Sequence, residues 1–135
     1  MNLSTDLMKE IREHARAELP NEACGYVMGD GDRACALYKM TNADHSPVHF
    51  SFNPAEQFEA LHAAIEMGKE LIAVYHSHPE TPARMSEEDI RKAHDTEIVY
   101  LIYAVGDDEI KGFTVTREKT VTEVPVEMVM YKEKA

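Results

Sequence analysis

Three segments of the chain carry the apolar spacing of an amphipathic helix. The first is predicted to begin at a capping serine, Ser4, and to end at Pro20 and Asn21. The second opens at 53–54 and stops at Gly68, and the third begins at Ser86 and reaches about Asp95. The faces predicted to be buried in the first two helices consist of apolar residues three or four apart: Leu7, Ile11, Ala15 and Leu19, then Phe58, Leu61, Ala64 and Ile65.

Between these helices lie short runs typical of strands. Strands are predicted at 23–28, 34–41, 71–75, 98–105, 110–116 and 121–126, and a short extended piece at 48–52. The turns at 29–32 and 106–108 indicate hairpins, whereas the nearly all-apolar runs 71–75 and 98–105 indicate strands buried on both faces. Without repeats or a linker, the pattern predicts one α/β domain over residues 1–135, with a mixed sheet flanked by helices.

Composition narrows the class of protein. The chain has 25 acidic against 14 Lys and Arg residues, a formal charge of −11, which argues against nucleic acid as a partner. Its longest apolar run has eight residues, Ile98 to Val105, far short of the roughly 18 that span a membrane. No secretory signal is evident, so a cytoplasmic protein is expected. The two cysteines, Cys24 and Cys35, form no C-x-x-C pair and are predicted to be buried and reduced.

The chemistry concentrates in His76-Ser77-His78-Pro79, followed after six residues by Ser86-Glu87-Glu88-Asp89. Histidines at i and i+2 of a strand point to the same face, and two such imidazoles can bind a metal. Asp89 can supply a third ligand from the next helix, with Ser86 one turn before it. Each half also has a structural interpretation, since Ser86 and Asp89 form an N-capping pattern and paired histidines occur on ordinary surfaces. Their conjunction favours the metal site.

The string H-S-H-P-x6-S-x-x-D resembles, at every defined position, the motif of the JAMM (MPN+) metalloproteases. These are zinc isopeptidases and peptidases that cut after ubiquitin or ubiquitin-like proteins. Their motif includes an upstream glutamate, which matches Glu22 in the pattern P-x-E-x-C-G of residues 20–25, as in short bacterial and archaeal members. The resemblance covers nearly the whole chain and implies a single MPN domain, JAMM-like and cytidine-deaminase-like in fold.

The resemblance also implies roles for five residues. His76, His78 and Asp89 would bind Zn²⁺, Glu22 would take and return a proton, and Ser86 would stabilise the oxyanion. Without the motif, Glu22 would be interpreted as a solvated carboxylate before a strand. The implied substrate is the C-terminal tail of a ubiquitin-like protein, of the sulfur-carrier type by analogy with short members. An acidic enzyme is expected to prefer a basic or neutral face beside that tail.

Two other hypotheses remain open from the residues: a non-catalytic MPN scaffold, and a zinc amide hydrolase acting on a small peptide-like substrate. The remaining histidines are predicted to be surface or partly buried side chains, although His45 and His49 could lie near the pocket. Gly29-x-Gly31-x-x-Ala34 fits a dinucleotide fingerprint only superficially, because a strand rather than a helix follows it. The oligomeric state is not predicted.

Overall fold

The computed structural model describes residues 1–130 and contains three helices there. Helix α1 (Thr5–Ala17) is capped by Ser4, whose side chain accepts a hydrogen bond from the Leu7 amide. Helix α2 (Pro54–Glu66) is capped by Asn53 and is followed by Gly68 at φ +67°. Helix α3 (Glu87–Lys92) is shorter than predicted and is capped by Ser86.

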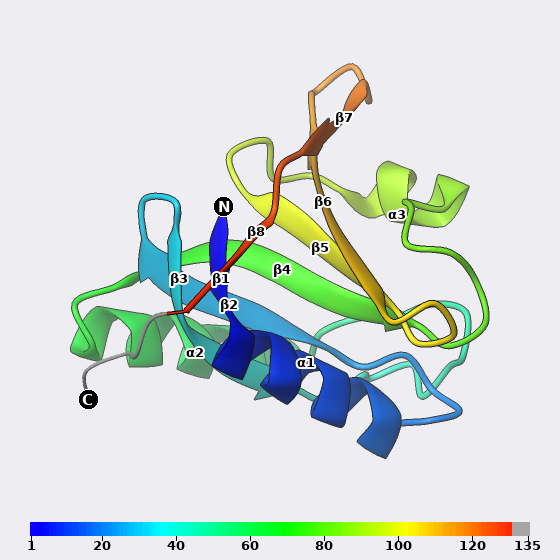
Figure 1. Ribbon diagram of the computed structural model, residues 1–135, viewed down its shortest axis with the longest axis horizontal. Coiled ribbons are helices and arrows are strands. Elements are labelled where there is room, and N and C mark those ends of the chain that lie inside the picture. Colours follow the sequence, from blue (N-terminus) through cyan, green and yellow to red (C-terminus); the bar gives the residue numbers. More distant parts are fainter. Residues whose placement is uncertain (131–135) are drawn as a thin grey trace.

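Eight strands form one mixed sheet in the order β7-β6-β5-β4-β2-β3-β1-β8 (Figure 1). Their bounds are β1 Asn2–Ser4, β2 Cys24–Asp30, β3 Arg33–Met40, β4 Glu70–His78, β5 Val99–Ala104, β6 Glu109–Val115, β7 Val121–Val124 and β8 Glu127–Val129. The central strand β4 runs antiparallel to β2 and parallel to β5. The predicted mixed sheet with flanking helices is therefore confirmed.

The two faces of the sheet carry separate apolar layers. Side chains alternate along a strand, so Ala73 and Tyr75 of β4 face α1 and pack with Leu7 and Ile11. On the opposite face Cys24 and Met40 pack against Ala60 of α2. His76, one residue after Tyr75, therefore lies on the α2 face. This placement leaves the end of β4 available for a site while α1 seals the other side.

A close contact on the α1 face fixes the middle of β4. Tyr75 is fully buried, and its ring covers Gly25 of β2 so tightly that a Cβ atom there would lie 2.5 Å from a ring carbon. The Tyr75 hydroxyl lies 2.6 Å from Nδ1 of His14 in α1. Gly25 is thus required for close approach of the aromatic ring, and the pair of hydrogen-bonded side chains joins α1 to the strand that carries the histidines.

Three parts of the sequence prediction differ from the structure. Leu19 lies beyond α1 and is exposed. Strands β1 and β8, each of three residues, pair with one another in parallel and were not predicted. The predicted apolar face of α2 is confirmed only at Ala64. Ala60 and Ala64 are buried, whereas Phe58 and Ile65 are 64% and 63% exposed and Leu61 is also exposed, because the helix approaches the sheet closely through its smallest residues.

Within residues 1–130, no helix is long and apolar enough to cross a membrane. Cys24 and Cys35 are both buried, as predicted. The predicted domain of 1–135 includes five residues outside the described part of the chain.

Candidate metal centre and active site

The two motif histidines occupy the end of β4 and face the same side, as the strand period predicts. Both are buried, and their Nε2 atoms lie 3.1 Å apart. Asp89, in the first turn of α3, completes the cluster, with its Oδ2 atom 3.2 Å from Nε2 of His76 and 3.1 Å from Nε2 of His78. Three electron-pair donors thus converge on one point from two elements of the fold.

A capping box holds the carboxylate of Asp89 in this position. The Ser86 amide donates to Oδ2 of Asp89 at 2.9 Å, and the Asp89 amide donates to Oγ of Ser86 at 3.0 Å. The capping interpretation and the metal-site interpretation of this motif therefore both apply. The hydroxyl of Ser86 acts as acceptor in the box, which leaves its own proton available to a further acceptor.

The three residues fit a tetrahedral metal ion. Ligands about 2.1 Å from zinc are separated from one another by roughly 3.4 Å, close to the distances between the three donor atoms here. His76, His78 and Asp89 are also the one group of potential ligands in residues 1–130 whose donor atoms converge this closely. Nδ1 of His78 lies 2.8 Å from the carbonyl oxygen of Pro82, which places a proton on Nδ1. Nε2, which faces Asp89, is therefore the nitrogen that can release its proton and offer a lone pair to a metal ion.

Burial and charge act in opposite directions on the cluster. Burial lowers the pKa of His76, even though Asp89 favours its charged form. Burial also opposes charge on His78, but hydrogen bonding to Asp89 and Pro82 outweighs it and raises the pKa of His78. For Asp89, burial favours the neutral acid, yet the hydrogen bonds from both histidines hold its pKa well below the usual range. The carboxylate is therefore ionised at neutral pH and available as a ligand.

Glu22 lies two residues before the start of β2 and is 3% exposed. Burial raises its pKa to about 8, His78 opposes the rise, and Asp89 reinforces it. Its Oε1 atom has no hydrogen-bond partner among the described residues. The neighbouring residue, Ala23, makes two hydrogen bonds to the buried Ser77 of β4. The Ala23 amide donates to Oγ of Ser77, and the Ser77 amide donates to the Ala23 carbonyl oxygen. A buried carboxylate without a partner is costly in a purely structural role.

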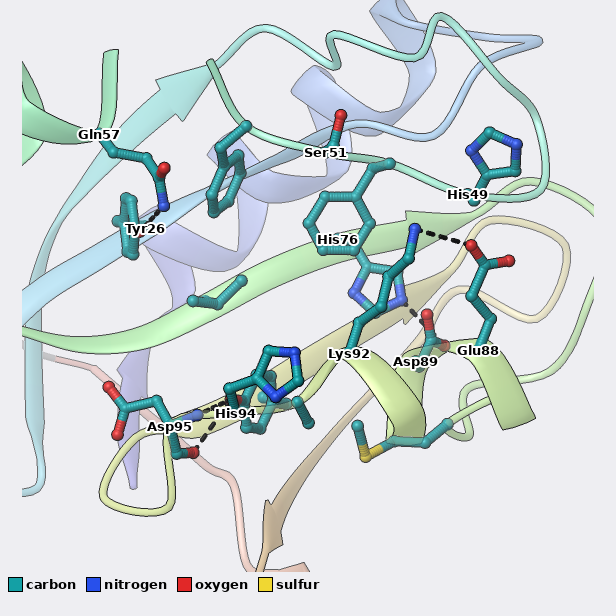
Figure 2. A pocket seen from close by; sticks show the side chains of 16 residues that line it. Tyr26, His49, Ser51, Gln57, His76, Glu88, Asp89, Lys92, His94 and Asp95 are labelled. Atoms are coloured by element: carbon teal, nitrogen blue, oxygen red, sulfur yellow. Dashed lines mark hydrogen bonds and ion pairs between the residues drawn. The ribbon is translucent and has the colours of Figure 1, made fainter. Parts of the chain in front are cut away.

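An apolar cleft of about 400 Å³ adjoins the cluster (Figure 2). Its floor is formed by Tyr26 of β2, Val74 of β4 and Tyr100 of β5. These residues lie side by side because Tyr26 and Tyr100 both pair with Val74 in the sheet. Phe50 stacks on the His76 ring at 4.7 Å between centroids. At the rim, the Lys92 ammonium lies 2.7 Å from Glu88. The cleft therefore offers a trough with an apolar floor that reaches two of the three potential ligands, His76 and Asp89.

The structure brings His76, His78, Asp89 and Ser86 together, and it buries Glu22 within their electrostatic influence. His49 lines the cleft as anticipated, whereas His45 is not among the lining residues. His94 also lines the cleft, although sequence reasoning gave it no such place. The supporting residues Phe50, Ser77 and Lys92 were missed. Phe50 and Ser77 reach their partners through folding of distant segments, which no local pattern indicates. Lys92 and Glu88 form an i,i+4 pair on α3, which helical spacing could have indicated.

Comparison with known proteins identifies the family. Residues 4–118 match Prok-JAB, described as prokaryotic homologs of the JAB domain. The chain belongs to this family. The family resemblance predicted from the motif is thereby confirmed.

Curated and structural relatives agree with this membership in the JAB family. The chain is 30% identical over 132 residues to the CysO-cysteine peptidase of Mycobacterium tuberculosis, covering 94% of this chain and 90% of the relative. It is 32% identical over 109 residues to the desampylase of Haloferax volcanii, covering 76% of this chain and 78% of the relative. The solution structure of a protein from Desulfitobacterium hafniense matches with a TM-score of 0.88 and 37% identity, over 96% of this chain and 93% of that protein.

Proposed function

We propose that this JAB-family chain is a zinc metallopeptidase of the JAMM isopeptidase type. It hydrolyses the peptide or isopeptide bond that follows the C-terminus of a ubiquitin-like protein of the sulfur-carrier class. The observation that carries the proposal is the convergence of His76, His78 and Asp89 within 3.2 Å of one another, beside a buried carboxylate, Glu22. The names of the relatives, a CysO-cysteine peptidase and a desampylase, support a hydrolase of protein conjugates.

His76, His78 and Asp89 would hold a zinc ion. That ion would supply a water activated near neutral pH and a Lewis acid for the carbonyl group to be cleaved. The orientation of the His78 ring comes from Pro82, whose carbonyl accepts the proton of Nδ1. The orientation of Asp89 comes from the Ser86 amide. Both contacts reduce the movement of the donor atoms.

Glu22 acts as general base and then as general acid. Its carboxylate takes a proton from the attacking water and returns it to the amine that leaves. Burial keeps bulk water away from this carboxylate and raises its pKa to about 8 in the metal-free chain. A nearby dication favours the ionised form, so ionisation of Glu22 is coupled to occupation of the three-ligand site.

Ser86 stabilises the substrate oxygen on which negative charge develops. Its hydroxyl proton is not used in the capping box, where Oγ is the acceptor of the Asp89 amide. Because the box fixes Oγ next to Asp89, the hydroxyl is oriented before the substrate binds. A preorganised donor of this kind contributes about 3 kcal/mol or more to lowering the barrier.

The cleft suits an extended tail. A C-terminal segment of a ubiquitin-like protein has no folded structure of its own and can lie along the trough floored by Tyr26, Val74 and Tyr100. The floor of the trough is aromatic and aliphatic, and polar side chains such as Gln57, Glu88 and Lys92 also line it. The net charge of −11 disfavours strongly acidic partners and nucleic acids.

The decisive experiment incubates the zinc-loaded chain with fusions of ubiquitin-like carrier proteins to a C-terminal peptide, with and without chelator. Mass spectrometry then gives the cut site. We expect cleavage directly after the carrier's C-terminal residue, loss of cleavage with chelator, and recovery on adding zinc. The variant Glu22→Gln should retain zinc and cleave only at a slow residual rate, while Glu59→Gln on the exposed surface of α2 serves as the matched control. Cleavage at the wild-type rate in Glu22→Gln would refute the role of Glu22.

A further inference from the structure

A buried amide side chain outside the motif organises the loop beside the site. Asn42 follows β3, is 7% exposed, and is saturated with hydrogen bonds. Its Nδ2 atom donates to the carbonyl oxygens of Glu22 at 3.1 Å, His49 at 3.1 Å and Ser46 at 3.4 Å. Its Oδ1 atom accepts from the amides of Asp44 at 3.0 Å and Ser51 at 3.4 Å. Because carbonyl oxygens only accept and amides only donate, these partners fix the orientation of the side chain.

These hydrogen bonds fasten the loop to the backbone of Glu22. Asn42 holds the Glu22 carbonyl, and the carbonyl oxygen of Ser46 accepts the Glu22 amide at 2.8 Å. Both backbone polar groups of Glu22 therefore bind to the segment 42–46. Within residues 1–130 Glu22 makes no other hydrogen bond, and its side-chain Oε1 has no partner. The direction of the carboxylate thus depends on a backbone that this loop holds.

The same loop reaches the metal-binding histidine. Asn42 binds the carbonyl of His49 and the amide of Ser51, the two residues that flank Phe50. Phe50 stacks on His76 with an angle of 28° between ring planes. Nδ1 of His76 is buried and has no hydrogen-bond partner in residues 1–130, so stacking takes the place of the hydrogen bond that usually orients a ligand histidine.

We propose that Asn42 is a positioning residue for the hydrolytic reaction. Through one side-chain amide it holds the backbone of the general base, Glu22, and the segment that presses Phe50 on His76. This inference rests on the proposed function, because it assigns Asn42 a role in that reaction. A positioning role differs from a role in loop stability alone. If Asn42 acts through Glu22, the effect of replacing Asn42 on turnover depends on the presence of the Glu22 carboxylate.

A double-mutant cycle tests this role. Asn42→Ala, Glu22→Gln and the double variant are compared with wild type in single-turnover cleavage of a carrier fusion at saturating enzyme, after zinc content is measured. We expect Asn42→Ala to retain one zinc and to slow cleavage by about 10- to 100-fold. On the Glu22→Gln background, the same substitution should slow the residual rate by a smaller factor, because only the contribution through Phe50 and His76 remains. Equal factors on both backgrounds would overturn the proposal.

Two further variants separate positioning from loss of fold. Asn42→Asp keeps the oxygen that accepts from Asp44 and Ser51 but replaces the donor group that holds Glu22 and His49. It should slow cleavage as Asn42→Ala does, and full activity would contradict the proposal. Ser4→Ala removes the cap of α1 on the far side of the sheet and should leave the cleavage rate unchanged. An inactive wild type would refute the proposed function, whereas an active wild type with an equally active Asn42→Ala would refute only this inference.

Discussion

Replacing Glu22 by glutamine should stabilise the metal-free protein in a pH-dependent way. Burial raises the pKa of Glu22 from its ordinary value near 4.5 to about 8. The folded state then binds this proton more tightly than the unfolded state, so Glu22 costs stability as the pH rises above 4.5, with the full cost reached above pH 8. At about 1.4 kcal/mol per pH unit, the cost is about 1 kcal/mol at pH 5, 3 at pH 7 and 5 at pH 9.

The assay is urea unfolding in the presence of chelator at several pH values. Glu22→Gln lacks the titrating group, so its free energy of unfolding should exceed that of wild type by a margin that widens by about 4 kcal/mol from pH 5 to pH 9. Glu59→Gln, at an exposed position of α2, should show no such widening. A margin for Glu22→Gln that stays constant within about 1 kcal/mol would refute the idea that burial controls this carboxyl group. Zinc should narrow the margin, because a dication stabilises the carboxylate.

Three other outcomes follow from the site and the fold. Purified wild-type protein should contain close to one zinc per chain, and His76→Ala or Asp89→Asn should lose it, as measured by elemental analysis. Ser86→Ala should slow turnover by about 100-fold or more and lower the free energy of unfolding by about 1 kcal/mol, whereas Ser86→Thr should recover part of both. In chemical denaturation, Ile65→Gln should change stability by less than about 0.5 kcal/mol and Ala64→Leu should cost about 1–3 kcal/mol, since only Ala64 is buried.

The ligand set could be predicted because each of its parts obeys a local rule. Alternation along a strand places His76 and His78 on one face, and the N-cap of a helix places Ser86 and Asp89 together. Family resemblance added Glu22, which by its residue type alone would be interpreted as a surface carboxylate. The burial of Glu22 depends on the loop that folds over it, and no pattern around position 22 indicates that loop.

The errors arose where the outcome depends on distant partners. Helix α2 has two neighbouring apolar stripes, and periodicity does not determine which of them contacts the sheet. The smaller stripe, containing Ala60 and Ala64, is the buried one. Strands β1 and β8 are too short to show alternation, and they exist because the two segments pair with each other. Asn42 belongs to none of the predicted helices or strands, and its five hydrogen-bond partners are defined only by the folded chain.

The contact between Gly25, Tyr75 and His14 has a consequence for protein engineering. Tyr75 and His76 are consecutive residues, so the backbone that seats the phenol ring on one face also aims the imidazole on the other. A side chain added at Gly25 would displace that ring, and the displacement would reach the ligand through a single peptide unit. Screens for inactive variants should therefore recover substitutions at Gly25, Tyr75 and His14 in variants that carry no change among the cleft-lining residues. The inner surface of α1, which packs on the sheet face opposite the cleft, belongs to the part of the molecule that a redesign must preserve.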